Sequence, residues 1–235
     1  MKKTSVILLV LITILLNFSY QGIAQSKAKK KASISEGTEW SNTWMVSTNK
    51  HDLPRVLIIG DSHVERYYQL VTNKLNKIAY CSKFTTSRSL GDPALIAQLK
   101  ALFFSYKFDV ITFNNGLHGV EYSDEQYSRY LPVVYKLFKK TNPGLKLIWV
   151  NTTPRRIGGK RPDFDQNNQG VINRNKAVEE FTKAKNIPLI DFYTPASVNL
   201  DFFDTDGIHF SKMGVEVQAK MVTSEILKAL NINGQ

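Results

Sequence analysis

The sequence predicts a single α/β domain with a five-stranded parallel sheet, and three observations lead to this prediction. From residue 55 onward, short apolar runs alternate with amphipathic stretches of helical length, which is the pattern of βαβ units. Polar or glycine-containing loops flank the apolar runs. The chain has 235 residues, which is enough for one domain with a substantial core.

The strands and helices follow from the lengths of these runs. Strands are expected at 56–59, 78–84, 110–113, 145–150 and 188–190. Helices are expected at 64–77, 93–104, 124–140, 168–185 and 212–230. Pro93 suits a first helical position, and Ser123 and Ser211 suit N-caps. Parallel sheets place their ligand sites beyond the carboxyl ends of the strands, so we expect an active site at that edge.

The first 24 residues have the features of a secretory signal peptide. Lys2 and Lys3 precede an apolar run over residues 6–16, and cleavage is expected after Ala24. An uncleaved membrane anchor is the alternative, but the apolar run is shorter than the roughly 20 residues that span a bilayer. We therefore expect export to the periplasm or the cell exterior, with no stable membrane insertion after cleavage.

The rest of the chain divides into two parts. Residues 25–50 are expected to form a Lys-rich tether and an N-terminal segment, and residues 51–235 to form the folded domain. Trp40 and Trp44 lie in the segment without clear periodicity. We interpret their aromatic surface as packing on the core rather than as a platform for a sugar.

Charge and cysteine content narrow the classes of partner. The chain has 31 Lys and Arg against 20 Asp and Glu, a formal net charge of +11 that falls to about +9 without the leader. Positive charge favours the binding of polyanions, but no nucleic-acid-binding motif accompanies it. We therefore expect no role in nucleic-acid binding. The single cysteine, Cys81, excludes an intramolecular disulfide.

Ser62 is the candidate nucleophile. It follows the first apolar run in the sequence Gly-Asp-Ser, directly before an expected helix. A serine hydroxyl needs a neighbouring base, and His209 can act as one. Asp206, three residues before His209, can orient the imidazole. The positive end of the helix and the backbone N–H of Ser62 would stabilise an oxyanion, so these residues predict a serine hydrolase.

These motifs resemble the SGNH, or GDSL-type, hydrolase family, and the resemblance extends from about residue 55 to the C-terminus. The first family block, Gly-Asp-Ser, is present at 60–62, and the last, Asp-x-x-His, at 206–209. His63 stands where many members have leucine. The resemblance implies a flavodoxin-like, three-layer α/β/α sandwich, a triad of Ser62, His209 and Asp206, and ester hydrolysis without a cofactor.

The middle blocks depart from the family pattern. The third block, usually Gly-x-Asn-Asp, has His118 where the oxyanion asparagine is expected. A neutral His118 could donate an N–H to the oxyanion, or Asn114 or Asn115 could supply an amide, and we favour His118. Gly91 fits the glycine of the second block, whose N–H would face the site, although it also fits an ordinary turn.

The favoured function is a secreted esterase that removes small acyl groups, chiefly acetyl, from carbohydrates by way of an acyl-Ser62 intermediate. The substrate would be an acylated small molecule or polysaccharide. This choice rests on the expected export, on the absence of a long hydrophobic lid insertion and on the family resemblance. A lipid acyl hydrolase or lysophospholipase is one alternative, and an inactive carbohydrate-binding protein is another. No metal is expected, because Asp163 and Asp165 have no partners at ligand spacing.

Overall fold

The structure, a computed structural model, describes residues 33–159 and 162–232. The expected signal peptide and residues 25–32 of the expected tether lie outside the described residues. In chain order the elements are β1 (Ser41–Trp44), β2 (Arg55–Gly60), α2 (Ser62–Lys74), β3 (Tyr80–Thr86), α3 (Pro93–Ser105), β4 (Val110–Asn114), α4 (Asp124–Thr141), β5 (Lys146–Val150), α5 (Asn168–Lys185), β6 (Leu189–Ile190), α6 (Tyr193–Ser197), the 3-10 helix η1 (Leu200–Phe202) and α7 (Lys212–Ala229).

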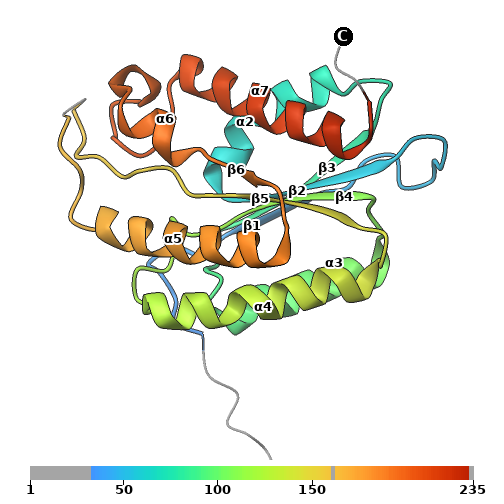
Figure 1. The fold of residues 1–235 in the computed structure, drawn as a ribbon, viewed down its shortest axis with the longest axis horizontal. Helices are drawn as coiled ribbons and strands as arrows, with labels where there is room; N and C mark the ends of the chain where they lie inside the picture. Colours follow the sequence, from blue (N-terminus) through green and yellow to red (C-terminus); the bar gives the residue numbers. More distant parts are fainter. Residues whose placement is uncertain (1–32, 160–161, 233–235) are drawn as a thin grey trace, which may run out of the picture. The chain divides into compact units, whose positions relative to one another are not determined.

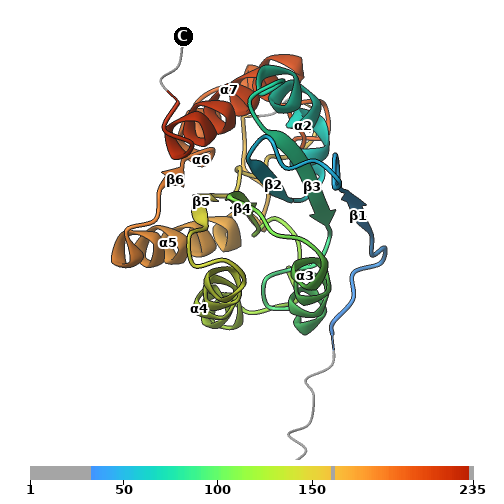
Figure 2. The same cartoon turned by 90° about the vertical axis from the view of Figure 1, so that its right-hand side faces the viewer.

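The strands form one sheet with the order β1-β3-β2-β4-β5-β6. Strands β2 to β6 are parallel, and β1 pairs antiparallel with β3 at the edge. Helices α3, α4 and α5 cover one face of the sheet, and α2 and α7 cover the other (Figures 1 and 2). The predicted α/β/α sandwich and its five parallel strands are confirmed, and β1 adds a sixth strand that was not predicted.

The edge strand β1 differs most from the prediction. Its sequence, Ser-Asn-Thr-Trp, is mostly polar, and all four residues are exposed. A strand without apolar alternation gives no periodic signal in the sequence. Trp44 is 59% exposed, so the expectation that it packs into the core is wrong, whereas Trp40 is partly buried.

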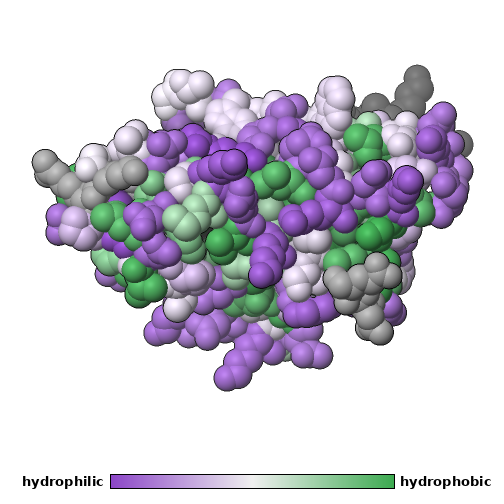
Figure 3. Space-filling view, turned by 90° about the horizontal axis from the view of Figure 1, so that it is seen from above, coloured by the Kyte–Doolittle hydropathy of each residue, from purple (hydrophilic) through white to green (hydrophobic). Residues whose placement is uncertain are grey.

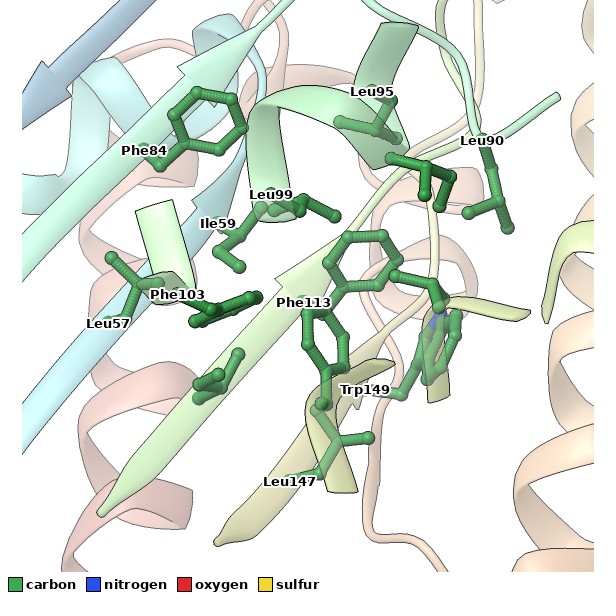
Figure 4. Packing of buried hydrophobic residues seen from close by; sticks show 14 of the residues in the cluster. Leu57, Ile59, Phe84, Leu90, Leu95, Leu99, Phe103, Phe113, Leu147 and Trp149 are labelled. Atoms are coloured by element: carbon green, nitrogen blue, oxygen red, sulfur yellow. The ribbon is translucent and has the colours of Figure 1, made fainter. Parts of the chain in front are cut away.

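Buried side chains cover both faces of the sheet. In β2, Leu57 and Ile59 belong to the cluster that includes residues of α3, α4 and α5. Val56 and Ile58 belong to the cluster that includes residues of α2 and α7. Figure 4 shows the first cluster, where Phe113 lies close to neighbouring aromatic and leucine side chains. Burial on both faces explains why these strands are continuous apolar runs in the sequence.

Four of the five predicted helix starts agree with the structure. Pro93 is the first residue of α3, and the Ser123 hydroxyl accepts a hydrogen bond from the Gln126 N–H at 3.1 Å. Ser211 caps α7 in the same way. Helix α2 begins two residues before the predicted position, so that Ser62 is its first residue. The nucleophile candidate therefore lies at a helix N-terminus.

Two features of the structure bear on contact with a membrane: the length of the helices and the character of the surface. Within residues 33–159 and 162–232, no helix has the length and the apolar character required to cross a bilayer. The face over α2 and α7 is mostly hydrophilic, with hydrophobic residues interspersed among the polar ones (Figure 3). Scattered apolar residues of this kind are usual on protein surfaces.

Candidate active site

The turn between β2 and α2 presents Ser62. Gly60 ends the strand, and a Cβ there would lie 2.5 Å from Cγ2 of the buried Val64, so a larger residue would not fit without movement. Asp61 caps the helix by accepting the His63 N–H at 2.9 Å. The N–H of Ser62 lies in the first helical turn and has no partner inside the helix. Both the hydroxyl and the N–H of Ser62 are thus available for chemistry at this turn.

The loop with the predicted acid and base is a short hairpin between η1 and α7. Phe203 and Phe210 pair antiparallel at its base, and both are buried. Gly207, at its tip, has a φ of +75°, and a Cβ there would lie 2.5 Å from the Arg156 carbonyl oxygen. Glycine is therefore required in the Asp-Gly-Ile-His sequence. This backbone brings His209 next to Ser62.

The structure places Ser62, His209 and Asp206 in one hydrogen-bonded chain. His209 Nε2 lies 2.8 Å from Ser62 Oγ, and His209 Nδ1 lies 2.6 Å from Asp206 Oδ2. Because a carboxylate only accepts, Nδ1 carries the hydrogen and Nε2 presents its lone pair to the serine hydroxyl. This is the arrangement that the sequence predicted for these three residues.

The electrostatics of Asp206 suit the orienting role. Partial burial would raise its pKa, but the His209 side chain and the N–H groups of Ile208 and His209 lower that pKa to about 2. The two backbone bonds, at 2.9 and 2.8 Å, both end on Oδ1. Oδ2 is thus left for the imidazole, and the carboxylate stays ionised at any pH at which His209 can act as a base.

His63 lies next to His209. Its side chain is buried, and its ring centroid lies 5.8 Å from that of His209. The Gln218 amide nitrogen lies 3.3 Å from Nδ1, so Nε2 carries the hydrogen and donates to Thr153 Oγ1 at 3.2 Å. Burial lowers the pKa of His63 and keeps the ring neutral. A neutral neighbour does not oppose formation of the His209 imidazolium.

The two asparagines proposed as oxyanion donors are engaged in the fold. Asn114 Nδ2 donates to the carbonyl oxygens of Val150 and Asn151, at 3.1 and 2.9 Å, which uses both of its amide hydrogens. Asn115 accepts the Leu90 N–H and donates to the Arg88 carbonyl. These contacts join neighbouring loops, and Asn114 has no hydrogen left for an oxyanion.

Gly91 retains a free donor. The residue is buried, and its N–H has no acceptor within residues 33–159 and 162–232. Buried backbone N–H groups are rarely left unpaired, so this one is suited to a ligand. A Cβ on Gly91 would lie 3.1 Å from the Tyr122 ring, which favours glycine at this position.

His118 is held by a residue that the sequence did not indicate. Its Nδ1 lies 2.9 Å from Oε2 of Glu36, and Oε1 of the same carboxylate accepts the Gly119 N–H at 2.6 Å. Because the carboxylate accepts from Nδ1, a neutral ring has no hydrogen on Nε2. The expected neutral His118 donor is therefore wrong for Nε2 in this arrangement. No sequence pattern links positions 36 and 118.

Arg174 is the second residue that the sequence did not indicate. Its guanidinium is buried and donates to four carbonyl oxygens of the loop that carries His118, at 2.7 to 3.1 Å. The acceptors are Gly116, His118, Gly119 and Tyr122. The ring of Tyr127 covers the guanidinium at 5.2 Å. One arginine thus fixes the backbone of the third-block loop.

Possible metal ligands are not clustered in the described part of the chain. Within it, no three His, Cys, Asp or Glu side chains come together in a way that could hold an ion. The absence of a metal and of a cofactor in the reaction stays a prediction.

Comparison with known proteins gives the fold. No protein-family model matches the sequence, and no curated protein proved similar to it. A GDSL-like lipase from Bacteroides thetaiotaomicron is similar in structure, with a TM-score of 0.62 and 17% identity over 75% of this chain and 89% of that one. The chain has the fold of the SGNH hydrolases. The resemblance expected from the sequence motifs is confirmed at this level.

Two further solved structures are similar to this chain. An acetyl xylan esterase has a TM-score of 0.61 at 14% identity, covering 73% of this chain and 99% of that one. A carbohydrate esterase of family 3 from Talaromyces cellulolyticus has a TM-score of 0.59 at 14% identity, covering 77% and 100%. The alignment with this chain covers nearly the whole length of both proteins.

Proposed function

We propose that this chain is a serine ester hydrolase. The observation that carries the proposal is the chain of hydrogen bonds from Asp206 through His209 to Ser62 Oγ, with both imidazole nitrogens engaged. A hydroxyl so placed can pass its proton to Nε2 as it attacks a carbonyl carbon. Ser62 follows the carboxyl end of β2, and α/β enzymes bind their ligands at this edge of the sheet, which supports the proposal.

The reaction follows from these positions. Ser62 Oγ bonds to the acyl carbon while His209 Nε2 takes its proton, and the carbonyl oxygen becomes an oxyanion beside the N–H groups of Ser62 and Gly91. Collapse of this intermediate expels the alcohol, which takes the proton from His209 and leaves acyl-Ser62. A water molecule then attacks the acyl group with His209 as base. The acid leaves and the Ser62 hydroxyl is restored.

We further propose that the substrate is a carbohydrate carrying small acyl groups, chiefly acetyl. A cavity of about 420 Å³ adjoins the loop of His118, and the polar part of its mixed lining suits sugar hydroxyl groups. That lining includes Ser123, Asp124, Arg155, Gln166 and Asn167. Two SGNH-fold structures are described as an acetyl xylan esterase and a carbohydrate esterase, which supports the same class. Export through the signal peptide would bring the enzyme to extracellular polysaccharides.

Lipid acyl hydrolysis is the second candidate, because another similar structure is described as a GDSL-like lipase. The two classes differ in the length of the acyl chain that the site accepts. Activity that rises beyond butyrate on p-nitrophenyl esters would favour the lipid class. Activity that is highest on acetate would favour the carbohydrate class.

The test is hydrolysis of p-nitrophenyl acetate and butyrate by the chain from Gln25 onward. Ser62→Ala should lower kcat by roughly 10⁴-fold or more, because no other group takes over the attack. Ser224→Ala, on the exposed surface of α7, is the matched control and should retain full activity. Turnover that survives in Ser62→Ala would contradict the proposal. A chain without turnover whose Ser62 also resists fluorophosphonate would instead be a binding protein.

A further inference from the structure

The hairpin of residues 203–210, which carries His209, contacts two other parts of the molecule. The loop after β5 binds the tip of the hairpin, where the Arg156 N–H donates to the Gly207 carbonyl oxygen at 2.8 Å. Helix α2, which begins with Ser62, is the second contact. Because the base belongs to the hairpin and the nucleophile to α2, the position of one element against the other sets the distance between Ser62 and His209.

Arg66 bridges α2 and this hairpin. It lies four residues after Ser62, so its side chain leaves the same face of the helix one turn further on. Its Nη1 atom donates to Asp204 Oδ2 and to the Phe210 carbonyl oxygen, both at 3.2 Å. Asp204 lies in the first strand of the hairpin, and Phe210 directly follows His209 in the second. One nitrogen of Arg66 therefore binds both strands.

Few other polar contacts join the two elements. Among residues 33–159 and 162–232, Ser62 and Arg66 make all the hydrogen bonds between α2 and residues 203–210. The bond from Ser62 to His209 does not last through the reaction, because the acylated serine has no hydroxyl hydrogen to donate. The two bonds from Arg66 are therefore the ones that persist while His209 activates the water.

The electrostatics of Asp204 suit a lasting contact. The Thr205 N–H, 2.8 Å from Oδ1, and the Arg66 guanidinium lower the pKa of Asp204. The carboxylate is therefore ionised at neutral pH. The side chains of Arg66 and Asp204 are 38% and 47% exposed, and ion pairs at such positions add little to stability. Removal of the pair should leave the fold intact and loosen the position of the hairpin.

We propose that Arg66 is a positioning residue that fixes the hairpin of His209 against the helix of Ser62. This inference rests on the proposed esterase function. Proton transfer needs the close approach of Nε2 and Oγ, which lie 2.8 Å apart, and a misplacement of about 1 Å can cost roughly 10²-fold in rate. Neither acceptor of Arg66 lines the cavity proposed for the sugar, so its contribution should fall on kcat rather than on KM.

The experiment measures kcat and KM on p-nitrophenyl acetate for Arg66→Met and Arg66→Lys. Arg66→Met keeps an unbranched apolar side chain but has no hydrogen to donate, so we expect kcat to fall roughly tenfold with KM unchanged. Both bonds of Arg66 come from one nitrogen, so the single ammonium group of Arg66→Lys can replace them. This variant should keep kcat within about threefold of the wild type.

Arg129→Met is the matched control, since Arg129 forms an exposed ion pair with Glu125 within α4. Its kcat and KM should stay at wild-type values. All rates are expressed per Ser62 that a fluorophosphonate labels to completion, so that unfolded protein does not count as slow enzyme.

The outcomes separate this inference from the esterase proposal. Arg66→Met with wild-type kcat would overturn the inference while Ser62→Ala remained inactive. A loss that falls on KM, or that Arg66→Lys does not restore, would give Arg66 a different role and overturn it too. A wild type that has no turnover and resists fluorophosphonate would overturn the esterase proposal with it.

Discussion

Two histidines in this molecule have the same type of partner on Nδ1 but different neighbours on Nε2. His209 and His118 each place Nδ1 against a carboxylate, at 2.6 and 2.9 Å. The Nε2 atom of His209 meets the Ser62 hydroxyl, whereas that of His118 has no partner within the described residues. A base needs a lone pair on this nitrogen, and an oxyanion donor needs a hydrogen there. The arrangement therefore suits His209 to act as a base, whereas a neutral His118 held in this way has no hydrogen on Nε2 to give to an oxyanion.

The largest expected effect is the difference in kcat between variants of these two histidines. His209→Ala removes the base and should lower kcat on p-nitrophenyl acetate by roughly 10⁶-fold. His118→Ala leaves the hydrogen bonds from Asp206 through His209 to Ser62 in place and should lower kcat far less. Steady-state kinetics of the two purified variants would measure the difference. Equal losses would show that the two rings do not have distinct roles.

The second prediction compares the two carboxylates. Asp206→Asn should lower kcat by roughly 10⁴-fold, because an amide donates to Nδ1 and reverses the tautomer that Ser62 needs. Glu36→Gln should cost only about tenfold, since Ser62 and His209 keep their geometry. The kcat values of both variants at one pH are the measurement. An Asp206→Asn protein as active as Glu36→Gln would contradict the tautomer argument.

The sequence revealed the first histidine because its carboxylate partner is local. Asp206 and His209 lie three residues apart, and the intervening glycine suits the positive φ of the loop. The parallel strands were equally predictable from the sequence, because burial on both faces makes each one an apolar run. The predicted bounds of α5, 168–185, coincide with those in the structure.

The second histidine could not be explained from the sequence because its partner lies 82 residues away. Glu36 precedes a strand, β1, whose four residues are exposed and have no apolar period. Arg174 stands in a mostly polar helix, and its buried role appears only when α5 packs against the third-block loop. Hydrogen bonds between distant loops depend on tertiary geometry, which periodicity does not record.

The third prediction concerns the support of the His118 loop. Arg174→Met should lower the free energy of unfolding by about 3 kcal/mol, because four loop carbonyl oxygens lose a buried donor. Arg129→Met is the control, since Arg129 forms an exposed pair with Glu125 and should change stability by less than about 0.5 kcal/mol. Urea unfolding of both proteins measures these values. Equal stability of the two variants would show that the loop does not depend on Arg174.

The smallest expected effect is the contribution of the Asp206 carboxylate to the free energy of unfolding, which should disappear in acid. The pKa of Asp206 is lowered from 3.8 to about 2 in the folded chain, so above 3.8 its ionised form stabilises the native state. As the pH falls from 3.8 to about 2, Asp206 becomes protonated first in the unfolded chain and then in the folded chain. The stabilisation is lost over this range. Asp206→Asn lacks this titration.

The wild type should therefore exceed Asp206→Asn in stability at neutral pH and lose that advantage in acid. The difference should stay below about 1 kcal/mol, because the Asp206 side chain is 46% exposed and solvent screens its pairing. Urea unfolding of both proteins at neutral pH and between pH 3.8 and about 2 would measure it. A difference that does not change with pH would mean that the His209 contact and the backbone N–H groups do not stabilise the ionised carboxylate. His209 would then lack the fixed partner that a base in this position needs.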